Sequence, residues 1–423
     1  MNIKLTFPLL LLFSLDALAG GYRVALQGQK ALGMGHTGVA MSESAETVFF
    51  NPAGMSLLSQ ESIVAGITLI SGDTKYQNTA TATAAETDNP IGTPINFYYS
   101  NKYDDKLTYG LGVYTPYGNR VEWPTDWAGS HLVNQIELAA IFIQPTLSYD
   151  LGDGMSIGGG PALIIGSVEF NRNLSTSLTD ASGNRSNVTI SADNVTAFGF
   201  NIGFMKKVND KFNFGINYRT EVELEAENEP ADFSNIPSSL AVAFTDTTFN
   251  ANLVLPAELT IGMSYEVDDK TTVAFDINRT YWSAYENLDV NFNDTTATPI
   301  DTSFTSSNPR NWQDANIFRV GVQHVLDETM TVRGGFYYDE SPIQDGYFAP
   351  ETPRNDSRGF TGGLTYNLDK NLSLDFSVLV LVFNEFTGSY DFYVEPNATS
   401  PSPFGGQYKA SVTTLGFGVD YTF

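Results

Sequence analysis

The chain has 423 residues, with 22 Lys and Arg against 48 Asp and Glu, so its formal net charge is −26. Such an acidic chain is unsuited to nucleic acid, because phosphate binding needs a basic face. The absence of Cys excludes a disulfide scaffold and thiolate metal sites. Aromatic residues make up 13% and Gly numbers 37, which suits a membrane barrel with aromatic girdles, although an acidic secreted β-protein also fits.

Residues 1–19 have the three parts of a signal peptide. Lys4 supplies the positive end, residues 5–15 are largely apolar, and Ala17-Leu18-Ala19 is a cleavage site that places the mature start at Gly20. The apolar run is too short for a spanning helix, and the longest later run, residues 376–383, is shorter still. The sequence therefore predicts an exported protein without a helical membrane anchor.

Residues 20–57 are polar and Gly-rich, and they fit neither a membrane helix nor a membrane strand. The segment closes with Asn51-Pro52-Ala53-Gly54, where Pro52 fixes φ and Gly54 permits a positive φ. We interpret residues 20–57 as a hatch inside a barrel and Asn51, Pro52, Ala53 and Gly54 as its closing turn. An ordinary turn is the alternative for these four residues.

From residue 58 onward, apolar residues alternate with polar or small ones. The pattern is clearest at the C-terminus, where Leu415, Phe417, Val419, Tyr421 and Phe423 share one face. Lipid outside and a polar lumen inside produce this alternation, although a soluble sandwich also alternates. The same alternation recurs in residues 212–219, 259–267 and 318–323.

Short polar turns alternate with long polar loops along the chain. The six short turns are residues 104–106, 152–154, 209–211, 268–270, 327–329 and 369–371. Short turns on one side and long loops on the other are typical of outer-membrane barrels. Six short turns join twelve strands in hairpins, and one further strand at each end of the series makes fourteen. The sequence therefore predicts an all-β fold: a 14-stranded antiparallel transmembrane β-barrel over residues 58–423, with both termini on the periplasmic side.

Two motif searches argue against catalysis and cofactors. Gly33-x-Gly35-x-x-Gly38 matches the dinucleotide fingerprint, but no apolar strand precedes it. The three His residues lack metal-binding spacing, and we find no G-x-S-x-G motif. We expect no enzyme activity, no metal and no cofactor.

Several ordered segments resemble the FadL family of outer-membrane transporters for long-chain fatty acids and other hydrophobic compounds. They are residues 31–38 and 45–55, which look like the family's hatch and NPA motif, and residues 112–118, 126–129, 255–259, 281–285 and 338–342. The resemblance covers the whole mature chain. It implies capture of ligand in an outer groove, transfer to a deeper pocket at the hatch, and lateral exit through a kink in the third strand.

The loop of residues 117–137 is the predicted outer groove. It carries the apolar side chains Trp123, Trp127, Leu132, Val133 and Ile136, and Asp126 is placed to cap a short helix. An exposed apolar face on an outer loop suits a hydrophobic ligand. The alternative is a loop that packs on its neighbours.

Three arginines occupy strand positions whose side chains should point into the lumen: Arg219, Arg319 and Arg333. They are candidate partners for a ligand carboxylate, or alternatively for acids in the lumen. Fatty-acid members of the family carry basic residues after the strand that here reads 163–168, and this chain has none there, so an uncharged hydrophobe remains open. Glu221, Glu223, Glu225 and Glu227 share one strand face, as a solvated acidic rim or a cation site.

The predicted lateral opening lies in residues 107–115, which contain Gly110 and Gly112 and are followed at once by Pro116. Gly inside a strand marks a bend, and Pro cannot donate to the strand ladder. We expect a gap in the wall here, filled by hatch residues such as Phe49 or Phe50. The alternative is a straight strand with an exit through the barrel floor.

Together these expectations describe a monomeric barrel of the bacterial outer membrane, in contact with lipid. Its predicted function is passive uptake of long-chain fatty acids or similar hydrophobic compounds. The alternatives are a general porin for polar solutes, a surface adhesin and a barrel lipase. A hatch inside fourteen strands argues against the open channel of a porin.

Overall fold

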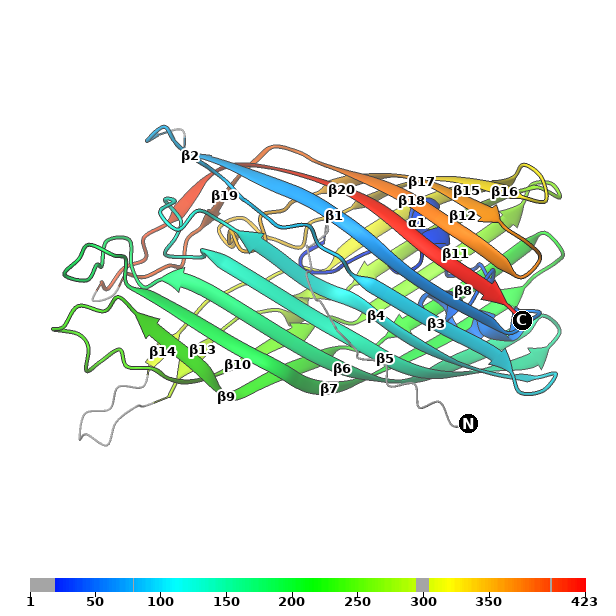
Figure 1. Cartoon of the computed structure of the whole chain (residues 1–423), viewed down its shortest axis with the longest axis horizontal. Helices are drawn as coiled ribbons and strands as arrows, with labels where there is room; N and C mark the ends of the chain where they lie inside the picture. Colours follow the sequence, from blue (N-terminus) through cyan, green and yellow to red (C-terminus); the bar gives the residue numbers. More distant parts are fainter. Residues whose placement is uncertain (1–19, 79, 294–303, 396–397) are drawn as a thin grey trace, which may run out of the picture.

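Antiparallel strands form one continuous wall in the computed structural model, which describes residues 20–78, 80–293, 304–395 and 398–423 (Figure 1). The predicted signal peptide lies outside the described residues. The closed wall has fourteen antiparallel strands, as predicted. None of the helices in the described ranges is long and apolar enough to cross a membrane.

Among the described residues, sixteen of the twenty strand segments make up the fourteen wall strands, because two wall strands are interrupted. The wall consists of β1 (Ser62–Asn78), β3 (Ile95–Lys102), β4 (Leu107–Glu122), β5 (Gln135–Gly152), β6 (Met155–Asn173), β7 (Asn187–Lys207), β8 (Phe212–Arg219) continued by β9 (Val222–Ser234), β10 (Thr247–Leu255) continued by β11 (Glu258–Glu266), β12 (Thr271–Thr280), β15 (Ala315–Val325), β16 (Met330–Asp339), β17 (Ser357–Asn367), β18 (Leu372–Phe383) and β20 (Phe404–Thr422). Short segments extend it at the long-loop end: β2 (Thr83–Glu86), β13 (Val290–Phe292), β14 (Phe304–Ser306) and β19 (Phe386–Tyr390).

The barrel closes where the first strand meets the last. β1 and β20 pair from Ser62 with Thr422 to Gln77 with Gln407. All six predicted short turns join consecutive wall strands at the end where the C-terminus lies (Figure 1). At the opposite end the wall strands continue into the long loops.

The two faces of the wall follow the predicted alternation. Large apolar side chains point outward and are exposed, as at Phe198, which is 76% exposed, and at Leu415, Phe417 and Val419. Their neighbours on the inner face are polar or small and buried, as at Thr414. An apolar outer band with a polar lumen is the arrangement that lipid outside requires.

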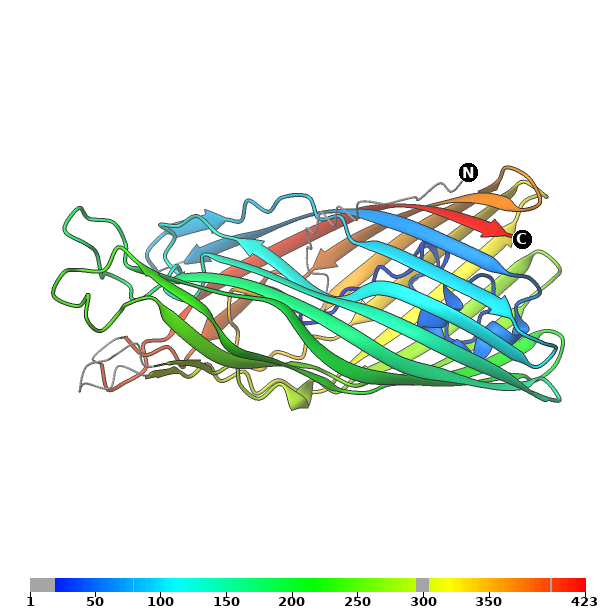
Figure 2. The same ribbon diagram turned by 60° about the horizontal axis from the view of Figure 1, so that its bottom comes forward.

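Residues 20–58, which we call the luminal segment, lie inside the barrel toward the short-turn end (Figure 2). They form three short helices: α1 (Gln29–Gly33), α2 (Thr47–Phe50) and the 3₁₀ helix η1 (Pro52–Leu57). A further 3₁₀ helix, η2 (Trp282–Ala284), lies in the connection between β12 and β13. Nearly all side chains of the luminal segment are buried against the inner face of the wall.

Candidate functional site

An apolar cavity lies in the barrel between the luminal segment and the long loops. Its walls come mainly from inward side chains of β6, β7, β9 and β10, among them Ile190, Ala192, Leu224 and Phe249. Its volume, measured as the space open to the centres of water-sized spheres, is about 120 Å³. A single water needs roughly 10–15 Å³ by that measure, so the cavity has room for an organic ligand.

The floor of the cavity is an aromatic group that joins the luminal segment to the loops. Tyr22 lines the cavity, and its ring meets Trp282 edge-on with centroids 4.8 Å apart. Tyr285 and Trp312 complete the group at 5.5 and 5.8 Å from Tyr22. The hydroxyl of Tyr22 donates to the carbonyl oxygen of Val254 in β10. Tyr22 therefore ties the first described residues of the chain to the wall of the cavity.

Two arginines, the buried Arg310 and the half-buried Arg172, form the polar edge of the cavity. Arg310 is ion-paired with Glu351 and lies over the ring of Tyr390 at 5.3 Å. Burial alone would lower the pKa of Arg310, but the Glu351 carboxylate outweighs it and raises that pKa. Arg172 donates to Ser306 Oγ at 2.9 Å and to the His131 carbonyl at 3.3 Å. In the described part of the chain, no Asp or Glu forms an ion pair with Arg172.

The loop predicted to be an outer groove is packed shut. Trp123, Trp127 and Val133 are buried, and the two indole rings stack 4.2 Å apart. Trp127 Nε1 donates to the Val133 carbonyl at 2.8 Å. Leu132 and Ile136 are also buried and line the cavity. The expectation of an exposed apolar face is therefore wrong: Trp127 packs on Tyr76 of β1 and Phe404 of β20, Trp123 stacks on Trp127, and only Leu132 and Ile136 of the predicted residues line the cavity.

The three predicted carboxylate partners lie elsewhere in the lumen and do not line the cavity. Arg219 lies 3.7 Å from Glu258, and Arg333 lies 3.4 Å from Glu43. Arg319 is buried on the inner face of β15. The alternation along each strand identified arginines that point into the lumen, but it did not give their position along the barrel axis. Arg172 and Arg310 were missed because the first lies in the last turn of alternation before β6 ends at Asn173, and the second lies in a loop without periodicity.

Asn51 anchors the closing turn of the luminal segment. Its side-chain nitrogen donates to the carbonyls of Val39, at 2.7 Å, and Phe204, at 3.0 Å, while its Oδ1 accepts from the Ala53 amide. Pro52 starts η1, where its missing N–H costs nothing. The buried Ala53 carbonyl accepts from Ser148 Oγ at 2.9 Å. The turn thus bonds both to the luminal segment and to wall strands β5 and β7.

Wall glycines allow the luminal backbone to approach closely. A Cβ at Gly335 of β16 would stand 2.1 Å from the amide nitrogen of Gly35. A Cβ at Gly158 of β6 would stand 2.5 Å from the carbonyl carbon of Pro52. Heavy atoms cannot approach so closely, so any side chain at these positions would displace the luminal segment.

β4 carries a break beside the luminal segment. Its register with β5 shifts between Tyr114 and Tyr117, and its pairing with β3 ends at Val113. The prediction that the strand ends before Pro116 is wrong, because β4 continues through Pro116 to Glu122. Thr115 and Pro116 have no partner in the register with β5 and form a bulge. Because the pairing with β3 has already ended, backbone groups here lack a wall partner on the β3 side.

The first residues of the luminal segment bond to these backbone groups. The Val24 amide donates to the Pro116 carbonyl at 2.8 Å, and the Gly118 amide donates to the Tyr22 carbonyl at 2.9 Å. Gln27 Nε2 donates to the Thr115 carbonyl at 2.8 Å. These contacts satisfy polar backbone that apolar surroundings would otherwise penalise.

Other predicted residues lie near this break but do not fill it. The Phe49 ring meets Tyr114 at 4.9 Å, and the Phe50 ring meets His36 at 4.9 Å. Gly110 and Gly112 are paired with both β3 and β5, and an added Cβ at either would meet Val48. The expectation that Phe49 or Phe50 fills the gap is therefore corrected, since residues 22–27 do so.

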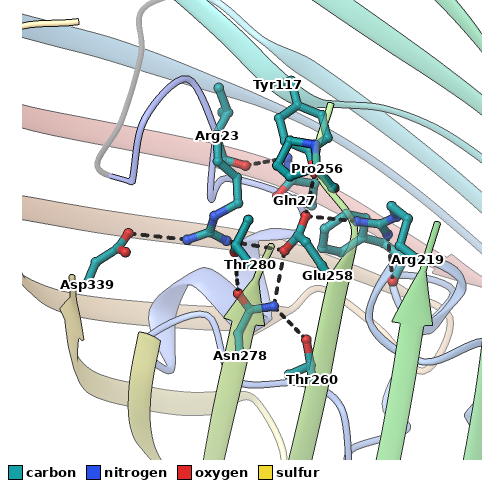
Figure 3. A network of polar contacts seen from close by, with 12 residues as sticks. Arg23, Gln27, Tyr117, Arg219, Pro256, Glu258, Thr260, Asn278, Thr280 and Asp339 are labelled. Atoms are coloured by element: carbon teal, nitrogen blue, oxygen red, sulfur yellow. Dashed lines mark hydrogen bonds and ion pairs between the residues drawn. The ribbon is translucent and has the colours of Figure 1, made fainter. Parts of the chain in front are cut away.

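A buried network of charges fixes the luminal segment beside the break (Figure 3). Arg23 bonds Asp339 of β16 at 3.3 Å and lies 3.8 Å from Glu258 of β11. Glu258 accepts from the Tyr117 hydroxyl at 3.0 Å. Arg219 approaches the same carboxylate from β8 and lies over the Phe49 ring at 4.5 Å. Glu258 thus joins the luminal segment, the break in β4 and the far wall.

Comparison with known proteins gives a consistent result. Residues 10–423 match the family described as "Outer membrane protein transport protein (OMPP1/FadL/TodX)". The long-chain fatty acid transport protein of Escherichia coli O157:H7 is 22% identical over 402 residues, covering 87% of this chain and 89% of that protein. Outer membrane protein P1 of Haemophilus influenzae is 23% identical over 419 residues, covering 88% of each.

Solved structures share the fold. A Pseudomonas aeruginosa FadL homologue superposes with a TM-score of 0.83 at 16% identity, covering 96% of this chain and 100% of that one. The Pseudomonas putida toluene transporter TodX gives 0.72 at 17% identity, covering 97% and 99%. The family match spans nearly the entire chain and agrees with the closed fourteen-strand wall. The chain therefore belongs to the OMPP1/FadL/TodX family of outer membrane transport proteins and is located in the bacterial outer membrane.

Proposed function

We propose that this protein takes up long-chain fatty acids or similar hydrophobic compounds passively across the outer membrane. It acts as a monomer in contact with outer-membrane lipid. The luminal segment is its hatch, the apolar cavity holds the ligand, and the break in β4 is the exit into the membrane. The names of relatives support the substrate class, since they include a long-chain fatty acid transport protein and a toluene transporter.

One observation carries the proposal: the segment that covers the break in β4 also forms the floor of the cavity. Tyr22 lines the cavity with its side chain, and its carbonyl accepts the Gly118 amide next to the break. A ligand that displaces Tyr22 therefore acts on the same few residues that close the wall. Capture and exit are then coupled through residues 22–27, without an energy source.

Lateral exit is the favourable path for such a ligand. Burying apolar surface yields about 25 cal/mol per Å², so a hydrophobe gains by passing from the cavity to lipid without entering the aqueous periplasm. Passage through the barrel floor would require removal of the hatch and exposure of the ligand to water. A porin requires a continuous aqueous channel instead, and the buried luminal segment argues against one.

The test is uptake of radiolabelled palmitate by cells that carry the protein, with cells lacking it as reference. Ala192→Trp places a large ring in the cavity and should abolish most of the uptake while the barrel folds normally. Thr196→Trp, at an exposed position on the same strand, is the matched control and should behave as wild type. Equal uptake by cells with and without the protein would refute the proposal, as would full activity of Ala192→Trp.

A further inference from the structure

The pairing between β7 and the next wall strand is interrupted beside the cavity. β7 pairs with β8 as far as Asn201, and its pairing with β9 resumes only at Ile190. Residues 191–199 and the facing residues 221–230, all of them described, therefore form no strand pairs with each other. We propose that these two stretches form a side window, through which uncharged hydrophobic molecules pass between the cavity and the outer leaflet of the membrane. This inference rests on the proposed function and adds a second route, which leaves the luminal segment in place.

The interruption is built into both strands. Asn194 of β7 and Asn228 of β9 have positive φ angles of 58° and 55°, and each strand shifts its register with its other neighbour at that point. Such bulges bend the strand that carries them and increase its twist. The window ends at Thr220, whose amide donates to the Phe200 carbonyl at 3.0 Å while its Oγ1 accepts from the Phe200 amide at 2.9 Å. β7 and β9 run next to each other along the lower edge of Figure 1.

The inner side of the window is the wall of the cavity. Four residues that line the cavity lie between the two paired stretches: Ala192 and Val195 on β7, and Leu224 and Ala226 on β9. Leu224 reaches across β7, since a Cβ on Gly166 of β6 would stand 2.8 Å from Leu224 Cδ1. An aliphatic side chain forms no hydrogen bond, so Leu224 can rotate away from the window without breaking one.

The outer side of the window lies at the boundary between lipid tails and headgroups. Phe198 is 76% exposed, against 44% for Phe200, as expected where no neighbouring strand is paired alongside. Exposed aromatic rings mark the membrane interface in outer-membrane barrels. Glu223 and Glu225 are exposed on β9, and carboxylates belong outside the hydrocarbon layer. Water therefore reaches the unpaired backbone there, which would be costly deeper in the membrane.

The charges around the window favour an uncharged occupant. Glu221, Glu223, Glu225 and Glu227 are exposed beside it, whereas residues 191–199 and 221–230 contain no Lys or Arg. These carboxylates repel the carboxylate of a fatty acid but not an uncharged hydrocarbon. We therefore assign uncharged hydrophobic molecules such as toluene to the window.

Passage through the window also needs fewer broken bonds than exit at β4. The break in β4 is covered by three hydrogen bonds that the luminal segment forms with wall residues 115–118. A ligand that leaves there has to displace all three, and each one lost slows passage several-fold. An uncharged molecule in the cavity meets only apolar side chains at the window.

The first experiment closes the window with a disulfide in Gly199→Cys/Val222→Cys. A Cβ on Gly199 would stand 2.7 Å from Val222 Cγ2, so cysteines at these positions are close enough to bond. The chain has no other Cys, and neither residue lines the cavity. The matched control is Ile202→Cys/Tyr218→Cys, which links an exposed pair on the same wall strands where they are regularly paired.

Uptake of radiolabelled toluene and palmitate is measured with oxidised and reduced cells, above the level of cells that lack the protein. Oxidation of the window pair should lower toluene uptake about tenfold, because toluene is then left with the slower route at β4. Palmitate uptake should stay unchanged, reduction should restore toluene uptake, and the control pair should affect neither compound. Unchanged toluene uptake with a verified crosslink would overturn the window, as would an equal loss of both compounds.

The second experiment separates this inference from the proposed function. Purified protein in liposomes is exposed to an uncharged aryl diazirine that partitions into lipid, and labelled residues are located by mass spectrometry. Labels on Phe249 and Leu253, which line the cavity on β10, should appear in the reduced window pair and disappear on oxidation. That result supports the window even if cells show no uptake. Cavity labels that persist in the oxidised protein would overturn it even if uptake is normal.

Discussion

The amide of Val24 donates a hydrogen bond of 2.8 Å to the carbonyl oxygen of Pro116. Pro116 belongs to the wall and Val24 to the segment inside it, so this bond closes β4 where its regular pairing fails. The neighbouring residues Arg23 and Tyr117 form an isolated antiparallel bridge. The luminal segment thus acts as a short substitute strand at the break.

A crosslink across this bridge should block exit. Antiparallel partners have Cα atoms about 4.5–5.5 Å apart, within the range that a disulfide spans. Arg23→Cys/Tyr117→Cys creates a single cysteine pair, because the chain has no other Cys. We expect oxidation to abolish palmitate uptake and reduction to restore it, so the same variant supplies its own control. Continued uptake by protein with a verified crosslink would show that ligand leaves elsewhere.

A side chain at Gly335 should expel the luminal segment. A Cβ there would stand 2.1 Å from the Gly35 nitrogen, whereas at the adjacent Gly334 it would meet nothing within 4 Å. Gly335→Val should therefore open an aqueous path and raise single-channel conductance in planar bilayers, while Gly334→Val stays closed. Both variants should fold, since valine suits a strand. Equal conductance of the two variants would count against the hatch role.

Arg172 should distinguish acidic from neutral ligands. It lies at the cavity without an ion-pair partner among the described residues, so it is the basic group available to a carboxylate. A hydrogen bond to a charged group contributes roughly 1.5–3 kcal/mol, so Arg172→Gln should raise half-saturation for palmitate about tenfold or more.

Toluene uptake should be unaffected by Arg172→Gln, because toluene has no charge, and Arg172→Lys should lie between wild type and Arg172→Gln for palmitate. If palmitate and toluene uptake fall equally in Arg172→Gln, the arginine has a structural role rather than a role in ligand recognition.

Glu46 should make stability depend on pH. Burial, reinforced by Asp375, raises the pKa of this hatch carboxyl from 4.5 to about 8. Between these values the folded protein holds a proton that the unfolded chain releases, so the free energy of unfolding falls as pH rises. The slope from one such proton is about 1.4 kcal/mol per pH unit. Glu46→Gln should remove this part of the decline in urea unfolding followed by tryptophan fluorescence at pH 5 and pH 8. An identical pH dependence in both proteins would contradict the assignment.

The sequence was sufficient to predict the wall because period-two alternation and polar turns are local signals. It placed all six short turns and the strand count. It did not reveal that β4 runs on through Pro116, since a bulge depends on what satisfies the freed carbonyl, and Val24 is remote in sequence. Likewise, the loop sequence around Trp123 and Trp127 predicts an exposed apolar groove when it is read alone. In the structure, Tyr76 and Phe404 from strands distant in sequence pack against Trp127. Arg172 could be recognised only once separate loops were brought together.

Lys30, in the luminal segment, bonds Asp420, three residues from the end of the chain, at 2.5 Å. During synthesis the residues of the luminal segment emerge among the first, yet this partner emerges among the last. This anchor of the segment therefore requires β20 to be in place. Closure of the β1–β20 seam and docking of the segment become late, linked steps of assembly. A barrel without β20 would lack both the seam with β1 and this anchor of the luminal segment.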